Sequence, residues 1–206
     1  MTGDPIVDTA AAPAADRTDG RTLRAERTRE AIIDAHMALI LDGDLQPTAV
    51  RIADRAGVSL RTLWGHFKDL EALFAAAGHK TLEIQYAGFL PVPADQPLAE
   101  RVSQFCAQRV RMLEVIAGAS RAAQIRLPYS PQLRRNRARH NERLRAEIEA
   151  LFAAELAGDE TLVAALLSVT TWPAWMGLRD DLELSVDDAA AVLHRTVTAL
   201  LTGAPS

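Results

Sequence analysis

The chain has 206 residues, of which 49% are hydrophobic and 24% charged, and its formal net charge is −4 at pH 7. This length supports one sizeable domain or two small ones with a shared core, and the composition is that of a globular protein. The single cysteine, Cys106, excludes an internal disulfide and a thiolate zinc site. No apolar run approaches the roughly 20 residues of a membrane span, and the acidic N-terminus is unlike a secretory signal, so we expect a cytoplasmic protein that binds no membrane.

Positive charge is concentrated in one segment of the chain. Residues 21–68 hold eight Lys and Arg against six Asp and Glu, whereas residues 1–20 and 69–206 each have a net charge of −3. Ala, Leu, Arg and Glu dominate the composition, and β-branched and aromatic residues are sparse, which favours an all-α fold. A nucleic-acid partner would be bound by the net-positive segment rather than by the chain as a whole.

The chain begins with residues 1–20, which are rich in Ala, Asp, Pro and Thr and lack periodicity, so we expect a disordered arm. Apolar residues at helical spacing predict a first helix from about residue 22 to 41. Pro47 and Thr48 suit the start of a second helix, which runs to about Ala56.

Turn and capping residues divide the rest of the chain. Gly57 stops the second helix, Ser59 caps a short third helix, and Asp69 caps a fourth. Five further helices follow from apolar spacing and from turn-forming breaks, at residues 97–117, 119–127, 130–157, 160–179 and 186–202. We therefore predict an all-α chain with a three-helix N-terminal unit, residues 21–68, and a larger helical body, residues 69–206.

Residues 48–74, TAVRIADRAGVSLRTLWGHFKDLEALF, contain a helix, a short turn with glycine and a second short helix. This is the helix-turn-helix arrangement, in which the second helix enters the major groove of DNA. Six apolar side chains would form its core. Ile52, Ala53 and Ala56 face inward from the first helix, Val58 fills the turn, and Leu63 and Phe67 anchor the second helix. The second helix then has an outward face that is too polar to be core, made of Leu60, Arg61, Thr62, Trp64, Gly65 and His66.

The outward face carries groups that can bind DNA. Arg61 can form a bidentate pair with guanine O6 and N7, which reads a base. Thr62 can bond a phosphate or contact a thymine methyl group, and Thr48 offers a hydroxyl and free amides at a helix N-terminus, which suits a phosphate. Three more side chains can contact backbone phosphates: Trp64, His66 and Lys68.

The motif also has a family resemblance. It reads Thr48, Ile52-Ala53, Ala56-Gly57-Val58-Ser59 and Thr62-Leu63-Trp64-Gly65-His66-Phe67. This pattern resembles the DNA-binding domain of the TetR/AcrR family of one-component transcriptional regulators, with a match over residues 24–75. The resemblance implies a homodimer that binds a palindromic operator and represses transcription, and a small-molecule effector that binds the body and moves the two DNA-binding units.

The resemblance also assigns roles by residue. It implies base readout by Leu60 and Arg61, and phosphate contacts from Thr48, Ser59, Thr62, Trp64, His66 and Lys68. Two positions depart from the family pattern: Trp64 replaces the usual Tyr, which leaves an indole N–H as the donor, and Leu70 stands where Lys is frequent. Gly65 inside a helix costs about 1 kcal/mol; it either allows close approach of the backbone to DNA or is merely tolerated.

The helical body has side chains that suit a ligand cavity. Ten candidates are apolar, aromatic or capable of a specific polar contact: Tyr86, Phe105, Arg109, Met112, Ile116, Gln124, Phe152, Trp172, Trp175 and Met176. Each is equally consistent with ordinary core packing. Arg109 is the polar candidate of most interest, because a buried Arg needs an acidic partner or a ligand.

The last two predicted helices carry apolar stripes. The stripes consist of Leu162, Leu166, Val169, Trp172, Val192, Leu193, Val197 and Leu200. Such stripes are either core or partner-facing, and the resemblance implies that this pair of helices forms a four-helix dimer interface, for which Trp is a suitable residue.

Other interpretations stay open. Three arginines before the first helix either contact DNA or form a solvated helix start: Arg21, Arg24 and Arg27. The basic run at residues 134–145, RRNRARHNERLR, fits an exposed helix face better than a second nucleic-acid surface. The histidines show no i, i+4 pair, so we expect no metal site and no cofactor. An architectural DNA-binding dimer without effector is the alternative function, and a helical enzyme using the cavity is less favoured, because the sequence offers no convergent catalytic set.

Overall fold

A computed structural model describes residues 15–203. Within these residues the chain forms eleven α-helices and one π-helical turn and contains no strand, which confirms the predicted all-α fold. The N-terminal helices are α1 Ala15–Leu41, α2 Ala49–Ala56, α3 Leu60–His66 and α4 Leu70–Tyr86. The remaining elements are α5 Leu98–Val115, α6 Ala117–Arg126, α7 Pro131–Leu151, α8 Ala153–Leu156, α9 Glu160–Thr170, α10 Trp172–Met176, η1 Gly177–Asp181 and α11 Val186–Thr202.

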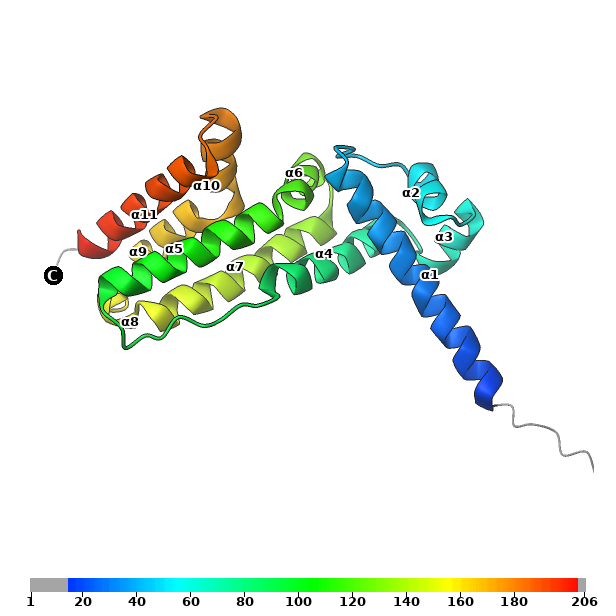
Figure 1. Cartoon of the computed structure of the whole chain (residues 1–206), viewed down its shortest axis with the longest axis horizontal. Coiled ribbons are helices and arrows are strands. Elements are labelled where there is room, and N and C mark those ends of the chain that lie inside the picture. The colour runs from blue at the N-terminus through cyan, green and yellow to red at the C-terminus, as the bar shows by residue number, and fades with distance from the viewer. Residues whose placement is uncertain (1–14, 204–206) are drawn as a thin grey trace, which may run out of the picture.

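The helices form two groups that α4 connects (Figure 1). At one end of the molecule α2 and α3 pack against α1, and at the other end α5, α7, α9 and α11 run side by side in a larger bundle. α4 follows α3 directly and packs against α1 as well as against α7 and α5. α1 extends beyond α3 at the edge of the molecule (Figure 1).

The helix-turn-helix is fixed by local caps, as the sequence predicts. The side chains of Thr48, Ser59 and Asp69 each accept the backbone N–H three residues ahead, over 3.3, 3.0 and 2.7 Å. Each cap satisfies one of the N–H groups that a helix start leaves without a partner. Between α2 and α3, Gly57 has a φ of +67°, the left-handed conformation that glycine adopts without steric cost.

A small hydrophobic core holds the helix-turn-helix against α1. Of the six apolar residues predicted to form this core, four are buried, namely Ile52, Ala53, Leu63 and Phe67, and Ala56 and Val58 are partly buried against them. They pack with side chains of α1 and of the first half of α4, namely Ile32, Ile33, Ala35, Leu39, Leu73 and Ala77. This core therefore crosses the boundary that we placed after residue 68.

The larger bundle has its own core. Phe105 and Phe152 meet edge to face with ring centroids 5.5 Å apart, and the indole N–H of buried Trp175 donates to a Glu114 carboxylate oxygen over 2.7 Å. Cys106 lies in this core, where burial raises the pKa of its thiol to about 12. The thiol is therefore uncharged at neutral pH.

The N-terminal arm is shorter than predicted. α1 begins at Ala15, so residues 15–20, which we assigned to a disordered arm, are helical. Residues 1–14 of that arm lie outside the described residues. Helix growth from a formed segment adds one hydrogen bond per residue and needs no new nucleus, and α1 continues through Gly20 despite its cost of about 1 kcal/mol.

The helix predicted at residues 160–179 is broken. α9 ends at Thr170, Thr171 is extended, and a new helix starts at Trp172 with Pro173 in its first turn. Proline lacks the N–H that would continue the ladder of α9, and the two helical segments are bent by 44°. Among residues 15–203 no single helix is long and apolar enough to cross a membrane. The two bent segments reach that length and apolar content only when they are taken together.

The backbone conformations of Gly57 and Gly65 predict that one added methyl group changes the stability of the protein in opposite directions at the two positions. Gly57→Ala should destabilise the protein by about 1–2 kcal/mol, because a Cβ is unfavourable in the left-handed conformation. Gly65→Ala is the matched control: the new Cβ also meets no atom within 4 Å, but Gly65 is helical, so stability should rise by up to about 1 kcal/mol. Urea unfolding followed by circular dichroism measures both, and unchanged or higher stability of Gly57→Ala would contradict the role of Gly57.

Candidate DNA-binding surface and ligand cavity

The nine residues predicted to bind DNA belong to the helix-turn-helix or directly follow it. Eight of them belong to α3 or flank it, and Thr48 is the N-cap of α2. Seven are exposed, whereas Thr62 and His66 are partly buried. Leu60 and Trp64, one turn apart on α3, are 39% and 40% exposed. α3 thus presents an accessible face that joins apolar surface to the Arg61 guanidinium.

The hydroxyl groups at the start of α3 are partly occupied. Ser59 Oγ and Thr62 Oγ1 lie 2.8 Å apart and share a hydrogen bond. One of the two hydroxyls must donate to the other, so one hydroxyl proton of the pair is free to reach a phosphate. The predicted phosphate contacts from Ser59 and Thr62 therefore reduce to one hydroxyl donor, in addition to the backbone N–H groups of the helix start.

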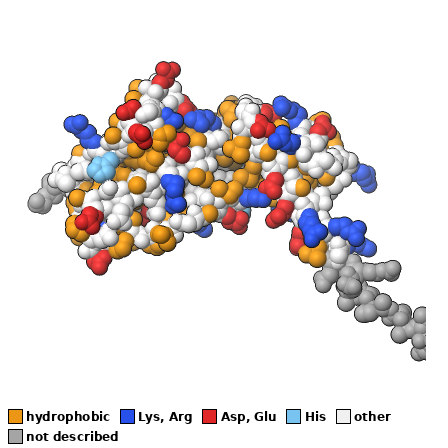
Figure 2. Space-filling view, in the orientation of Figure 1, with side chains coloured by type: hydrophobic (Ala, Val, Ile, Leu, Met, Phe, Trp, Pro, Cys, Tyr) orange, Lys and Arg blue, Asp and Glu red, His pale blue; other side chains and the backbone are white. Residues whose placement is uncertain are grey.

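Arg29 of α1 holds the end of α3. Its Nη1 donates to the His66 carbonyl oxygen over 3.2 Å, and its guanidinium lies 4.3 Å from the centroid of the Phe67 ring. These contacts fix α3 against the part of α1 that carries three exposed arginines, Arg21, Arg24 and Arg27. Figure 2 shows basic side chains on this projecting part of α1. Positive charge beside α3 would favour contact with DNA phosphates.

A carboxylate ties α4 to the start of α7. Glu71 Oε2 accepts the Ser130 hydroxyl over 2.9 Å and the Gln132 backbone N–H over 3.0 Å. A carboxylate is favoured at a helix N-terminus, because it meets unpaired N–H groups and the positive end of the helix dipole. Since Glu71 is the second residue of α4, the contact lies two residues after the Asp69 cap and close to α3.

The two helices cross closely one to two turns further along. Asn136 Nδ2 of α7 donates to the Phe74 carbonyl oxygen of α4 over 3.3 Å. A Cβ at Gly78 would lie 2.2 Å from the same Nδ2 atom. A larger residue at position 78 would therefore displace the Asn136 side chain and break its bond to α4.

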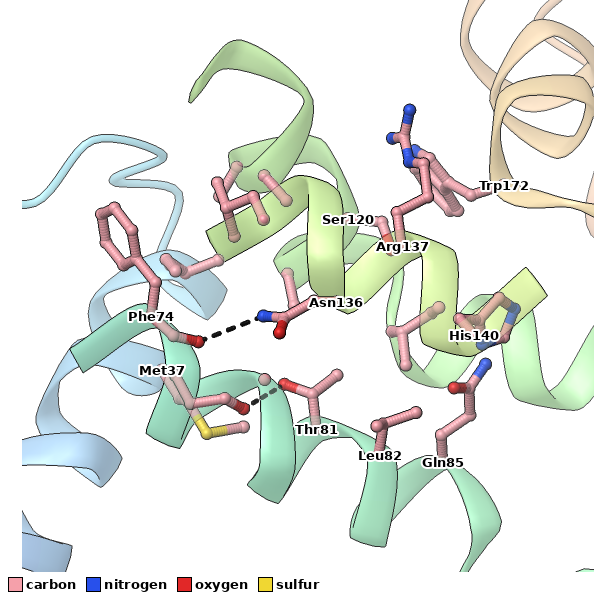
Figure 3. Close-up of a pocket in the computed structure, with 18 of the residues that line it drawn as sticks. Met37, Phe74, Thr81, Leu82, Gln85, Ser120, Asn136, Arg137, His140 and Trp172 are labelled. Atoms are coloured by element: carbon pink, nitrogen blue, oxygen red, sulfur yellow. Dashed lines mark hydrogen bonds between the residues drawn. The ribbon is translucent and has the colours of Figure 1, made fainter. Parts of the chain in front are cut away.

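A cavity of about 310 Å³ lies beside this crossing, between α1, α4, α6 and α7, with Trp172 at one edge (Figure 3). Its volume is that of a small-molecule site. Apolar side chains form much of the wall, including Met37, Ile40, Phe74, Leu82, Ile116 and Leu133. Polar side chains in the wall include Thr81, Gln85, Ser120, Asn136, Arg137 and His140.

Some polar groups of the wall are bonded to the protein and others are available. Thr81 donates to a carbonyl one turn back in α4 over 2.8 Å, and Gln85 Nε2 donates to the Met112 carbonyl oxygen over 3.4 Å. Arg137 Nη2 donates to Gln124 Oε1 over 2.6 Å. A guanidinium has five N–H donors, so four donors of Arg137 have no partner among the described residues.

Two histidines of the wall are uncharged at neutral pH. Burial lowers the pKa of His36 to about 4, with a further lowering by Arg126 and an opposing effect of Asp44. Burial likewise lowers the pKa of His140 to about 4, and nearby cations add to the effect: Arg109, Arg143 and Arg137. Both imidazoles can therefore accept as well as donate a hydrogen bond.

Two of the ten predicted ligand residues, Ile116 and Trp172, line this cavity. Tyr86 lines a separate hollow between α4 and α7. The other seven do not line the cavity: Phe105, Arg109, Met112, Gln124, Phe152, Trp175 and Met176. All of these except Gln124 and Met176 are buried, and they belong to the packed core.

The sequence interpretation missed the polar part of the wall. Four of its residues lie within the basic run of α7, at helical spacing: Asn136, Arg137, His140 and Asn141. We expected that run to be an exposed face, and its other side is exposed: Arg134, Arg135, Arg139 and Arg143. The available signal was the stripe of uncharged Asn and His side chains inside an otherwise charged segment.

Most of the predicted dimer stripe packs inside the protomer. Five of its eight residues are buried there: Leu162, Leu166, Trp172, Leu193 and Val197. They serve the core because α9 and α11 pack on each other and on α5 and α7. Val192 is 40% exposed and open to a partner, whereas Val169 and Leu200 are partly buried against the core of the protomer.

Three solved structures share this arrangement of helices. A transcriptional regulator from Rhodococcus sp. RHA1 has a TM-score of 0.63 and 22% identity, over 87% of this chain and 96% of its own. A protein from Mesorhizobium loti MAFF303099, assigned to the TetR family of transcriptional regulators, has a TM-score of 0.59 and 20% identity, over 87% and 98%. A TetR transcriptional regulator from Rhodococcus sp. RHA1 has a TM-score of 0.51 and 16% identity, over 87% and 99%.

These comparisons define the fold class. No protein-family model matches the sequence, and no curated protein shows significant similarity to it. The chain has the fold of TetR-type transcriptional regulators, with an N-terminal helix-turn-helix and a helical C-terminal body, as the sequence resemblance implies.

The low pKa of His36 predicts a loss of stability in acid. Unfolded His36 binds a proton near pH 6.5 and folded His36 near pH 4, so between these values the unfolded state holds more protons and stability falls as the pH falls. At pH 5 this difference in proton binding lowers the free energy of unfolding by about 2 kcal/mol. His36→Gln should remove it, as urea unfolding of both proteins at pH 7.5 and 5.0 would measure. An equally steep pH dependence in the variant would contradict the assignment.

Proposed function

We propose that the protein is a DNA-binding transcriptional regulator that acts as a homodimer on a palindromic operator and responds to a small molecule. The observation that carries the proposal is the exposed face of α3 in a capped helix-turn-helix, within a TetR-type fold. Repression and release by the effector follow from the family resemblance.

The geometry of α3 supports a division of roles among its side chains. In a helix-turn-helix the N-terminal residues of the second helix contact base edges. Leu60 and Arg61 occupy those positions and are exposed. Thr48 at the start of α2 and Lys68 after α3 lie at the two ends of the motif, where side chains reach the DNA backbone and set its register.

The cavity supports a ligand response. Its wall includes residues of α1, α4 and α7, and α4 is connected to α3 by three residues. A molecule between α4 and α7 that binds one helix arrangement better than another would shift α3 relative to the body. This favours an effector-responsive regulator over an architectural DNA-binding dimer, for which a cavity of this size has no role.

Selection of bound sites from random duplex DNA tests the proposal. A palindromic consensus is the expected result, with half-sites about one helical turn apart or somewhat further. Binding that is non-specific at low salt and absent at physiological salt would overturn it. In that case the departures at Gly65 and Leu70 would mark a motif that no longer recognises an operator.

Two substitutions on the motif separate base reading from phosphate contact. Arg61→Ala should relax the preference at one position of the operator and weaken binding to the selected site by about 1–3 kcal/mol. Lys68→Ala should weaken binding to all duplexes about equally and reduce the slope of log K against log salt by about 1. Repeated selection and salt titrations distinguish them; an unchanged consensus for Arg61→Ala would refute its base-reading role.

A further inference from the structure

The cavity wall carries positive charge without a balancing acid. Arg126 and Arg137 line it together with the neutral imidazoles of His36 and His140. Among the described residues, none that lines the cavity is Asp or Glu. A cation in a mainly apolar wall loses hydration, and a counter-ion would offset that loss.

Neither arginine of the wall has an acidic partner in the protein. Within residues 15–203, the ion pairs with N–O distances up to 4.0 Å include neither Arg126 nor Arg137. Arg126 lies 5.5 Å from the centroid of the Phe74 ring, and Arg137 is bonded to the neutral amide of Gln124. Burial lowers the pKa of Arg137, in keeping with the lack of an acidic partner.

A third cation lies in the core behind the wall. Arg109 is fully buried; its Nη2 donates to the Thr170 carbonyl oxygen over 2.9 Å, and its Nε has no partner among the described residues. The charge of Glu147 acts on Arg109, but the two are not within ion-pair distance. The charge of Arg109 in turn acts on His140, in the cavity wall. Arg137 in the wall and Arg109 behind it thus place two cations on the α7 side of the cavity, and the charge of Glu147 opposes that of Arg109.

We infer that the cavity binds an organic monoanion, a mainly apolar molecule with one carboxylate, and that Arg137 pairs with the carboxylate. The four unbonded N–H donors of Arg137 are enough for a bidentate pair. In Figure 3 Arg137 lies near Ser120 and Trp172 at one edge of the cavity, and Met37 and Phe74 lie across it. The apolar body would extend from Arg137 toward these two side chains. The inference rests on the proposed function in one respect, that such a molecule would be the effector.

Calorimetric titration of the full chain without DNA tests the inference. The probes are straight-chain carboxylates of six to ten carbons, the primary amides of the same lengths and the matching alkylammonium ions, at pH 7.5. We expect at least one carboxylate to bind about tenfold or more tightly than its amide, and the ammonium ion to bind most weakly. Equal binding of acid and amide, tighter binding of the ammonium ion, or no carboxylate with a Kd below about 1 mM would overturn the inference.

Variants assign the preference to Arg137. Arg137→Gln should reduce the ratio of carboxylate to amide affinity to about twofold or less, whereas Arg137→Lys should keep most of it, since it keeps the charge. Arg111→Gln is the matched control, because it removes one exposed positive charge of α5 outside the cavity wall. An equal loss in Arg111→Gln, or an unchanged ratio in Arg137→Gln, would contradict the role of Arg137. Thermal unfolding first establishes that each variant is folded.

The outcome is separable from that of the proposed function. Carboxylate binding is measured without DNA, and operator selection is measured without ligand. A protein that selects an operator but prefers amides would refute the monoanion and leave the regulator intact. A protein that binds carboxylates but selects no operator would refute the regulator and leave the monoanion intact.

Discussion

The polar crossing of α4 and α7 is the contact on which the rest of the structure depends. Glu71 bonds the first turn of α7, and Asn136 of α7 bonds the carbonyl oxygen of Phe74 in α4. Because Gly78 has no side chain, Asn136 can lie against α4 at this crossing. α4 also contributes Leu73 and Ala77 to the core of the helix-turn-helix. A displacement of α4 along α7 would therefore be transmitted to α3 by packed side chains and by a short connection.

The same crossing sets the place and chemistry of the cavity. α4 and α7 bring amide, hydroxyl and imidazole groups to the wall, and α1 and α6 supply apolar surface together with His36, Ser120 and Arg126. The polar groups differ in how firmly they are held. Thr81 and Asn136 are bonded to the backbone of α4, whereas Arg137 is bonded to one side-chain amide. A ligand would thus contact side chains that are held against the backbone of α4, and one side chain of α7, Arg137, that can reorient.

The sequence predicts what is local and fails where distant helices decide. The caps at Thr48, Ser59 and Asp69 and the turn at Gly57 depend on neighbouring residues, and the structure confirms them. The cavity depends on which side of α7 turns toward α4, about 60 residues earlier, and no local pattern in a basic run specifies that. The apolar stripe of α11 shows the same limit: Leu193 is buried in the core and Val192 beside it is exposed, although both are apolar. Periodicity identifies a face but does not say what covers it.

Burial of the single cysteine has a practical consequence. With a pKa of about 12, the Cys106 thiol is present as thiolate only in a very small fraction at neutral pH, and its side chain is 3% exposed. Maleimide and methanethiosulfonate reagents react with thiolates that they can reach. A cysteine introduced on an exposed helix face can therefore carry a spin label or fluorophore without prior removal of the native one. Distances between such labels, with and without DNA or a small molecule, become measurable in an otherwise unaltered protein.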